Sequence, residues 1–160
     1  MTLLEAFDWL ETTGLGAAIR NSTWLFPAVE AVHLIALASL GGAVFALDLR
    51  LLGFGLRSQP VAEVAGNVRL WFAVSLGAMF ATGVPLFVSE AVKCYWSTSF
   101  WVKMSALATA TVFVLCVRNP IARAQADHAA ERAWTNRLVG AVSLGLWFTV
   151  AAAGRWIGFS

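Results

Sequence analysis

The sequence predicts an all-α integral membrane protein, a four-helix bundle preceded by an N-terminal amphipathic helix at the membrane interface. Hydrophobic residues make up 59% of the 160 residues, charged residues only 12%, and the mean hydropathy is +0.74. Because a soluble domain is about a quarter charged, a chain this apolar lacks the polar surface of a soluble monomer. The same composition excludes intrinsic disorder. The length suits one membrane domain over residues 1–160.

The N-terminal segment, residues 2–20, is the predicted interfacial helix. Leu3, Leu4, Phe7 and Leu10 recur near helical spacing, with acidic residues between them. An amphipathic helix next to a membrane span lies in the interface. The segment lacks the basic start of a signal peptide, so we expect the first apolar run to remain as a membrane span.

Four later stretches are each long enough to cross a bilayer, which requires about 20 residues. These predicted spans lie at about residues 24–47, 70–91, 98–117 and 138–157. The second and third are joined by a short link, which forces an antiparallel hairpin. The link between the third and fourth begins at Arg118-Asn119-Pro120 and is predicted to form a short helix at the membrane surface.

The basic residues predict the orientation of the spans. The links after the first and third spans carry seven of them, namely Arg50, Arg57, Arg69, Arg118, Arg123, Arg132 and Arg137. The opposite side carries four, namely Arg20, Lys93, Lys103 and Arg155. Basic links stay in the cytoplasm, so both termini are predicted to face outward, into the periplasm of a bacterial inner membrane. Trp24, Trp96, Trp101 and Trp156 then form an outer aromatic belt.

Partners other than lipid are only partly defined by the sequence. The net charge of +2, without a clustered basic face, excludes a nucleic-acid partner. Small residues recur every fourth position in three spans, as at Ala38, Gly42 and Ala46. Such stripes pack helices closely within one bundle or between copies. The sequence therefore leaves open whether the protein forms a homo-oligomer or part of a larger membrane complex.

Two further features are interpreted as structural. Cys94 and Cys116 fall near opposite membrane faces, about 30 Å apart if the third span is one helix, which is too far for a disulfide. Asp48-Leu-Arg50 ends the first span and is interpreted as an interfacial anchor, with a salt link to Arg69 or to lipid phosphate.

Ionisable side chains in the outer third of the predicted bilayer form a candidate site. Glu30 and His33 are spaced i, i+3 on the first span and share a face. Glu90 ends the second span, Lys103 lies one turn into the third, and Arg155 lies near the end of the fourth. Charged groups inside a membrane are costly, so each is a functional candidate. The structural alternative is an ionic clasp in which Glu30 and Glu90 pair with Lys103 and Arg155.

A transition-metal ion is one cofactor that this site suggests. Copper, iron or zinc would take His33, Glu30 and Glu90 as ligands, since imidazole and carboxylate bind such ions. Nearby Lys103 opposes a bound cation unless it pairs with a carboxylate. His128 belongs to a charged polar link and is interpreted as a solvated side chain.

Haem b is the other cofactor that the site suggests, and we rate it above a metal ion. His33 would be an axial ligand, and Lys103 and Arg155 would suit the haem propionates. Met79 or Met104 would serve as a weak second ligand, although methionine also commonly fills gaps in a core.

No motif in the chain indicates an enzyme that acts on a soluble substrate. A nucleotide-binding loop, a nucleophile elbow, Cys-x-x-Cys and His-Glu-x-x-His are all missing from the sequence. The leading hypothesis is a small membrane protein that binds haem b or a metal ion for redox or metal-handling work. The alternatives are a non-catalytic accessory or assembly subunit of a membrane complex, and a carrier of a small solute or ion.

Several short motifs together resemble a known family. They are Trp24-Leu-Phe-Pro27-x2-Glu30-x2-His33-Leu, Gly41-Gly42, Asp48-Leu-Arg-Leu-Leu-Gly53, Thr82-Gly83, Glu90-Ala91, Tyr95, Phe100-x2-Lys103 and Gly154-Arg-Trp-Ile-Gly158. The pattern resembles an uncharacterised family of small bacterial four-span inner-membrane proteins, which implies fold and location and no activity. The His-Leu and Gly-Gly spacing is more faintly similar to the membrane domain of copper-resistance D-type proteins. This chain lacks their richer His and Met content.

Overall fold

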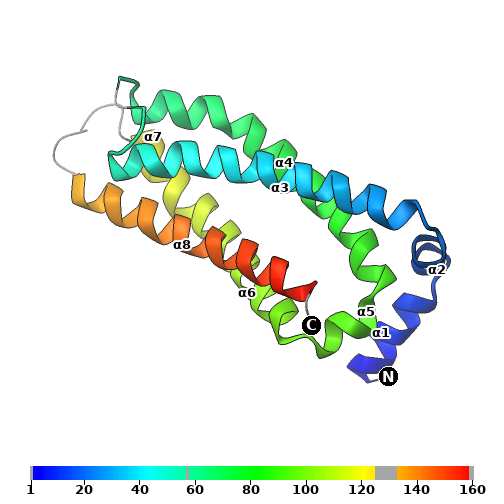
Figure 1. The fold of residues 1–160 in the computed structure, drawn as a ribbon. Helices are drawn as coiled ribbons and strands as arrows, with labels where there is room; N and C mark the ends of the chain where they lie inside the picture. The colour runs from blue at the N-terminus through cyan, green and yellow to red at the C-terminus, as the bar shows by residue number, and fades with distance from the viewer. Residues whose placement is uncertain (1, 57, 125–132, 159–160) are drawn as a thin grey trace.

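A computed structural model describes residues 2–56, 58–124 and 133–158, and four long apolar helical stretches dominate them (Figure 1). The first two are α3 (Leu25–Leu52) and α4 (Val61–Ser89). The third is α6 (Thr98–Phe113), continued by the π-helix η1 (Val114–Arg118) and by α7 (Asn119–Ala124), and the fourth is α8 (Ala133–Ile157). The length and hydropathy of these stretches confirm the predicted all-α bundle of a multi-pass membrane protein.

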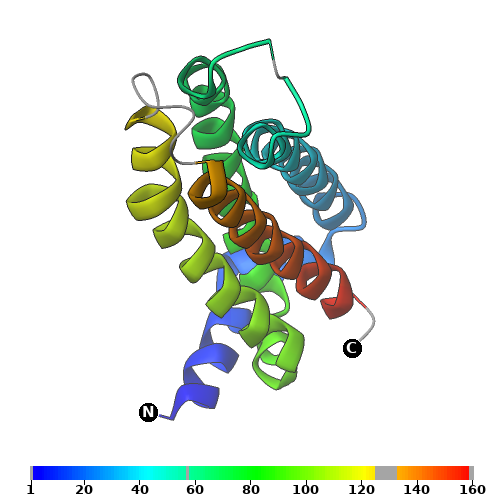
Figure 2. The same cartoon turned by 90° about the vertical axis from the view of Figure 1, so that its left-hand side faces the viewer.

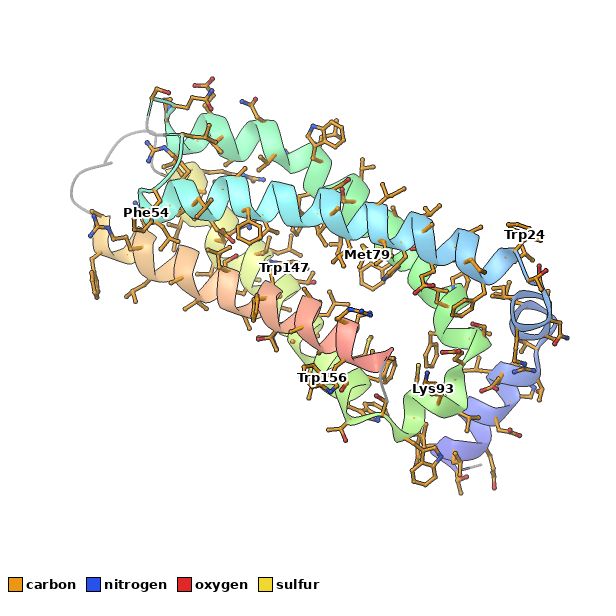
Figure 3. All side chains as sticks on the ribbon, in the orientation of Figure 1. Trp24, Phe54, Met79, Lys93, Trp147 and Trp156 are labelled. Atoms are coloured by element: carbon orange, nitrogen blue, oxygen red, sulfur yellow. The ribbon has the colours of Figure 1, made fainter. Side chains whose placement is uncertain are left out.

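Three short helices gather at one end of the bundle, which we call the terminal end: α1 (Leu3–Thr12), α2 (Gly14–Asn21) and α5 (Ala91–Trp96) (Figure 1). The opposite end carries the α3–α4 link, residues 53–60, and is called the link end. Figure 3 shows Trp24 and Phe54 at these two ends of α3.

The predicted interfacial helix is divided into α1 and α2 at Thr13, whose hydroxyl accepts a hydrogen bond from Gly16 N and so begins a new helix. Both helices pack onto the bundle. Glu11 accepts a hydrogen bond from Val92 N of α5 at 2.8 Å and pairs with Arg20 of α2 at 2.7 Å. The Phe7 ring contacts Phe87 edge to face, with centroids 5.3 Å apart. These contacts fasten the N-terminal segment to α4 and α5.

The long helices extend beyond the apolar stretches that predicted them. α3 runs past Asp48 and ends at Gly53, where φ is +85° and glycine avoids a steric cost. α4 begins directly after Pro60, because proline fixes the backbone that enters a helix. Polar residues near these ends lie inside the helices, where a hydropathy pattern predicts links.

The third stretch also continues through Pro120, where the sequence predicts a surface link. Proline has no N–H for the carbonyl four residues earlier, and its ring crowds that carbonyl. The chain accommodates this with the wider turn of η1, in which Asn119 N donates to Val114 O. Arg118 is therefore helical, and it is 1% exposed. Other residues of the predicted links, namely Arg57, His128 and Arg132, lie outside the described residues.

Two apolar clusters fill the bundle. The central cluster is built around Leu40, Val44, Phe72 and Trp147, and the Phe72 and Trp147 rings meet edge to face at 5.8 Å. The second cluster lies toward the link end, around Leu47, Leu51, Val64 and Val139. Figures 1 and 2 show α6 and α8 side by side, with α3 and α4 forming the other pair.

Gly140 permits a close approach of α8 to α3. A Cβ atom at this position would lie 2.9 Å from Asp48 O and 3.2 Å from Leu51 Cβ.

We predict that Gly140→Ala destabilises the protein by about 1–3 kcal/mol, because the backbone of α3 must move away. Gly145→Ala is the matched control on the same helix, since nothing lies within 4 Å of its Cβ position. Unfolding followed by circular dichroism in detergent measures both, and equal stability of the two variants would contradict the close contact.

Candidate functional site

His33 is held at the terminal end by a side chain of the neighbouring helix. Its Nδ1 lies 2.7 Å from Thr82 Oγ1 on α4. The Thr82 hydroxyl donates its own proton to Ala78 O at 2.6 Å, so it accepts the hydrogen bond from His33 Nδ1–H. A neutral imidazole protonated at Nδ1 keeps a lone pair on Nε2. This is the arrangement found in metal-ligating histidines, whose second nitrogen donates to a fixed acceptor.

Gly83 gives the imidazole its space. A Cβ atom on Gly83 would lie 3.2 Å from His33 Cε1, which is closer than most carbon contacts allow. The pair Thr82-Gly83 therefore does two things for His33: one residue orients the ring by a hydrogen bond, and the other lets α4 approach it. Both residues belong to the short motifs that resemble the four-span family, and the sequence alone gives neither of them a role.

Lys103 lies on α6 and extends along α8. A Cβ atom on Gly154 would lie 3.5 Å from Lys103 Cε and 3.6 Å from Nζ. The side chain is partly buried, and within the described part of the chain its ammonium has no carboxylate partner. It is close enough to act electrostatically on His33. An unpaired ammonium within a membrane-spanning helix is costly, so an anion from outside the chain would stabilise it.

The other predicted site residues are placed differently. Glu30 is exposed, one turn before His33 on α3. Glu90 lies at the break between α4 and α5, and its Oε2 is 3.9 Å from Lys93 Nζ. Arg155 is exposed and directly follows Gly154 on α8. Among the described residues, neither Glu30 nor Glu90 forms an ion pair with Lys103, so this part of the predicted ionic clasp is not formed.

Cys94 is a buried neighbour of this region. Both cysteines are free thiols, as expected from their separation in the sequence. Burial, together with the nearby Glu90 carboxylate, raises the pKa of the Cys94 thiol to about 11. The thiol therefore stays protonated at neutral pH and is a poor metal ligand. Across the described ranges, no three His, Cys, Asp or Glu side chains come together in a group suited to a metal ion.

A second polar cluster lies near the link end, and the sequence did not predict it. Asp48 is completely buried, with Oδ1 3.2 Å from Arg118 Nη1 and Oδ2 accepting a hydrogen bond from Ser143 at 2.6 Å. The interpretation of Asp48 as an interfacial anchor is therefore wrong. Three elements, α3, η1 and α8, each contribute one member. One signal in the sequence pointed here, because Asp48 shares the helical face of Leu40, Val44 and Leu47, all of which are buried.

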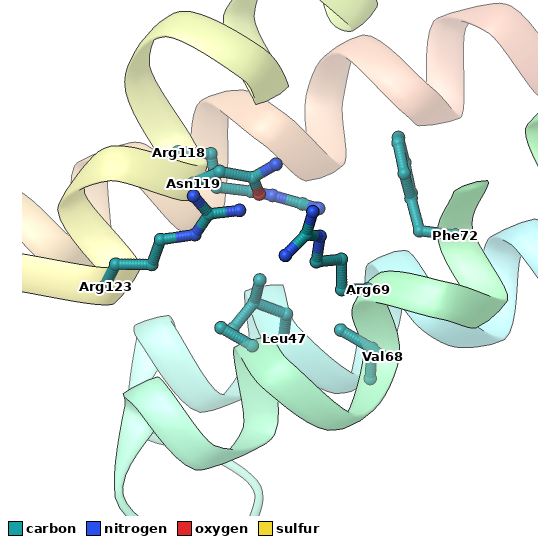
Figure 4. A pocket seen from close by; sticks show the side chains of 8 residues that line it. Leu47, Val68, Arg69, Phe72, Arg118, Asn119 and Arg123 are labelled. Carbon is teal, nitrogen blue, oxygen red and sulfur yellow. The ribbon is translucent and has the colours of Figure 1, made fainter.

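The Arg118 guanidinium has further surroundings besides Asp48. Its Cζ lies 5.4 Å from the centroid of the Phe72 ring, within the range of a cation–π interaction. Its Nε is buried and has no hydrogen-bond partner. A cavity of about 30 Å³ adjoins it (Figure 4). The residues that line this cavity are Leu47, Ala65, Val68, Arg69, Phe72, Arg118, Asn119 and Arg123.

The buried pair of Asp48 and Arg118 leads to a testable prediction about the free energy of unfolding. Asp48→Asn leaves the Arg118 charge buried without its counterion, and we expect a loss of about 3–5 kcal/mol. The double variant Asp48→Leu/Arg118→Met removes both charges and is expected to recover most of that loss. Ser143→Ala, which removes only one hydrogen bond, should cost about 1–3 kcal/mol. Unfolding free energies in detergent rank the three variants, and a double variant as unstable as Asp48→Asn would refute the coupling.

The comparisons with known proteins place the chain in a family and add no activity. No curated protein and no solved structure matches the chain. Residues 6–160 match the model of a family of unknown function, DUF6644. This match covers nearly the whole chain, including all four long helical stretches and both polar clusters. The chain therefore belongs to this uncharacterised family, DUF6644, as a multi-pass membrane protein.

Proposed function

We propose that the protein binds haem b at the terminal end of the bundle, with His33 as its axial ligand, and that it serves electron transfer. The observation that carries the proposal is the hydrogen bond between His33 Nδ1 and Thr82 Oγ1 at 2.7 Å. It leaves Nε2 as the nitrogen that would bind iron, and it fixes the plane of the ring. When bound, haem b supplies a one-electron couple between ferric and ferrous iron.

The donor set favours haem over a bare metal ion. A zinc, copper or iron ion needs three or four protein ligands, and the described residues gather no group of three. A porphyrin brings its own four nitrogens and needs only axial ligands from the protein. Lys103 also fits, because its unpaired ammonium opposes a bare cation and attracts the carboxylates of a haem propionate.

The neighbouring residues would divide the work of holding the group. Lys103 would neutralise one haem propionate, and Arg155, the residue after Gly154, is the candidate for the other. Met79 packs against the central apolar cluster, and Met104 is 40% exposed. His33 would therefore be the one protein ligand to the iron, and neither methionine is assigned to it.

An absorption spectrum of the detergent-purified protein, air-oxidised and then reduced with dithionite, tests the proposal. Under haem-replete expression we expect a Soret band that shifts on reduction. His33→Ala should lower the haem content at least about tenfold, and Thr82→Val should weaken haem binding about 10- to 100-fold, since it releases the ring. His128→Ala is the matched control, because it removes the other histidine of the chain, and it should leave the spectrum unchanged.

A flat visible spectrum from well-folded protein would overturn the haem proposal. Circular dichroism of the same samples separates loss of haem from loss of the bundle. The competing function is then the accessory or assembly subunit, in which His33 and Thr82 serve only to join α3 to α4. In that case His33→Ala lowers the unfolding free energy and has no haem to lose.

We further propose that the chain lies in a bacterial inner membrane with its terminal end in the periplasm. The link end carries an excess of arginine, as expected for the cytoplasmic side. Thr12→Cys and Ser58→Cys place single exposed thiols at opposite ends, in a background in which Cys94 and Cys116 are alanine. A membrane-impermeant maleimide applied to cells with a permeabilised outer membrane should label position 12 and spare position 58. The reverse pattern would invert the assignment.

A further inference from the structure

Three arginines meet around the small cavity at the link end. Arg69 comes from α4, Arg118 from η1 and Arg123 from α7, and Figure 4 shows their guanidinium groups turned toward the same space. Asn119 lies among them and adds an amide. This convergence joins helices that are far apart in the sequence, so it is a property of the folded bundle and not of a local basic run.

The cavity carries positive charge that the protein does not balance. Asp48 is the one carboxylate in ion-pair contact with these three arginines among the residues that the structure describes, and it pairs with Arg118 alone. Arg69 and Arg123 have exposed side chains with no ion pair there. Arg118 is 1% exposed, and its Nε lacks a hydrogen-bond acceptor. A buried donor without an acceptor is costly, so an oxygen that carries negative charge would be stabilised in the cavity.

The size of the cavity indicates how such an anion enters. Its volume of about 30 Å³ holds roughly two water-sized spheres. Such a space would admit one or two oxygens of a phosphate, and the exposed Arg69 and Arg123 side chains would contact the rest of the group. Guanidinium forks bind phosphate oxygens in pairs, which is why arginine is common in phosphate sites.

The position of the cavity along the bundle indicates which molecule carries the phosphate. Arg118 and Arg123 lie near the end of the third apolar stretch, Thr98–Ala124, which is long enough to cross a bilayer. The ends of such helices lie at the height of the lipid headgroups. A second hollow, of about 360 Å³, faces another side of α4 and is not part of the site, because its lining residue Trp71 points about 160° away from Arg69 on that helix.

We propose that the link end binds the headgroup of an anionic phospholipid, with its phosphate against Arg69, Arg118 and Arg123. Basic pockets between membrane helices hold anionic headgroups in this way. The site is separate from the haem site proposed above and does not rest on it. It also gives Arg118 an acceptor that Asp48 and Phe72 do not provide.

Native mass spectrometry of the protein in detergent, titrated with phosphatidylglycerol or phosphatidylcholine, tests the site. We expect tighter binding of phosphatidylglycerol, and the double variant Arg69→Gln/Arg123→Gln should weaken it roughly 30-fold, at about fivefold for each arginine. Both side chains are exposed, so their loss should not unfold the bundle. Arg137→Gln is the control, because it removes an exposed charge on α8 that does not line the cavity, and it should leave the affinity unchanged.

Each other outcome overturns the proposal in a recognisable way. Equal affinity for the two lipids, or equal loss in the Arg137→Gln control, would mean that only general surface charge attracts lipid. Full competition by millimolar inorganic phosphate, with no preference for the diacyl lipid, would identify a free phosphate site and reject the lipid. The haem content of the double variant should match that of the unchanged protein, so this test fails or succeeds independently of the proposed function.

Discussion

The buried contact between Asp48 and Arg118 is the constraint on which the rest of the bundle depends. Burial removes both charges from water, and their mutual attraction offsets that desolvation cost only when the geometry is held closely. The helices α3, η1 and α8 therefore have little freedom to slide past one another. Ser143 fixes α8 through the second carboxylate oxygen. His33 lies fifteen residues before Asp48 on one unbroken helix, about 22 Å away. The contact at the link end therefore helps to set the height of His33 against Lys103 of α6, which η1 continues, and against Gly154 of α8.

The central apolar cluster separates the two polar regions. Leu40, Val44, Phe72 and Trp147 pack between the height of His33 and that of Asp48. Packed aliphatic and aromatic side chains exclude water and carry no charge. The terminal end and the link end are therefore two sites with different chemistry. The site proposed at the terminal end is built around the His33 imidazole and the Lys103 ammonium. The cluster at the link end is built around the guanidinium groups of Arg69, Arg118 and Arg123 and the Asp48 carboxylate.

The sequence predicts the fold well because hydropathy and length dominate in a membrane, and the four apolar stretches appear as four long helical stretches. It misses Arg118 because the apolar run ends at Val117 and Pro120 suggests a link, whereas η1 carries the helix through. It finds His33 and Lys103 as costly ionisable residues. It does not find Thr82 or Gly154, because helix rotation decides which faces meet. Glu30 shows the same limit, since a spacing of three residues turns it about 60° away from His33, and it is exposed.

Positive charge without an internal partner is common to both ends of the bundle. Lys103 at the terminal end, and Arg69 with Arg123 at the link end, have no carboxylate in contact among the residues described. Water at the membrane surface compensates such charges only in part, because their side chains arise from helices long enough to span the bilayer. Bound anions would balance this charge. A haem propionate at Lys103 and a lipid phosphate at the arginines, as proposed, would be the same physical solution at opposite ends of one set of helices.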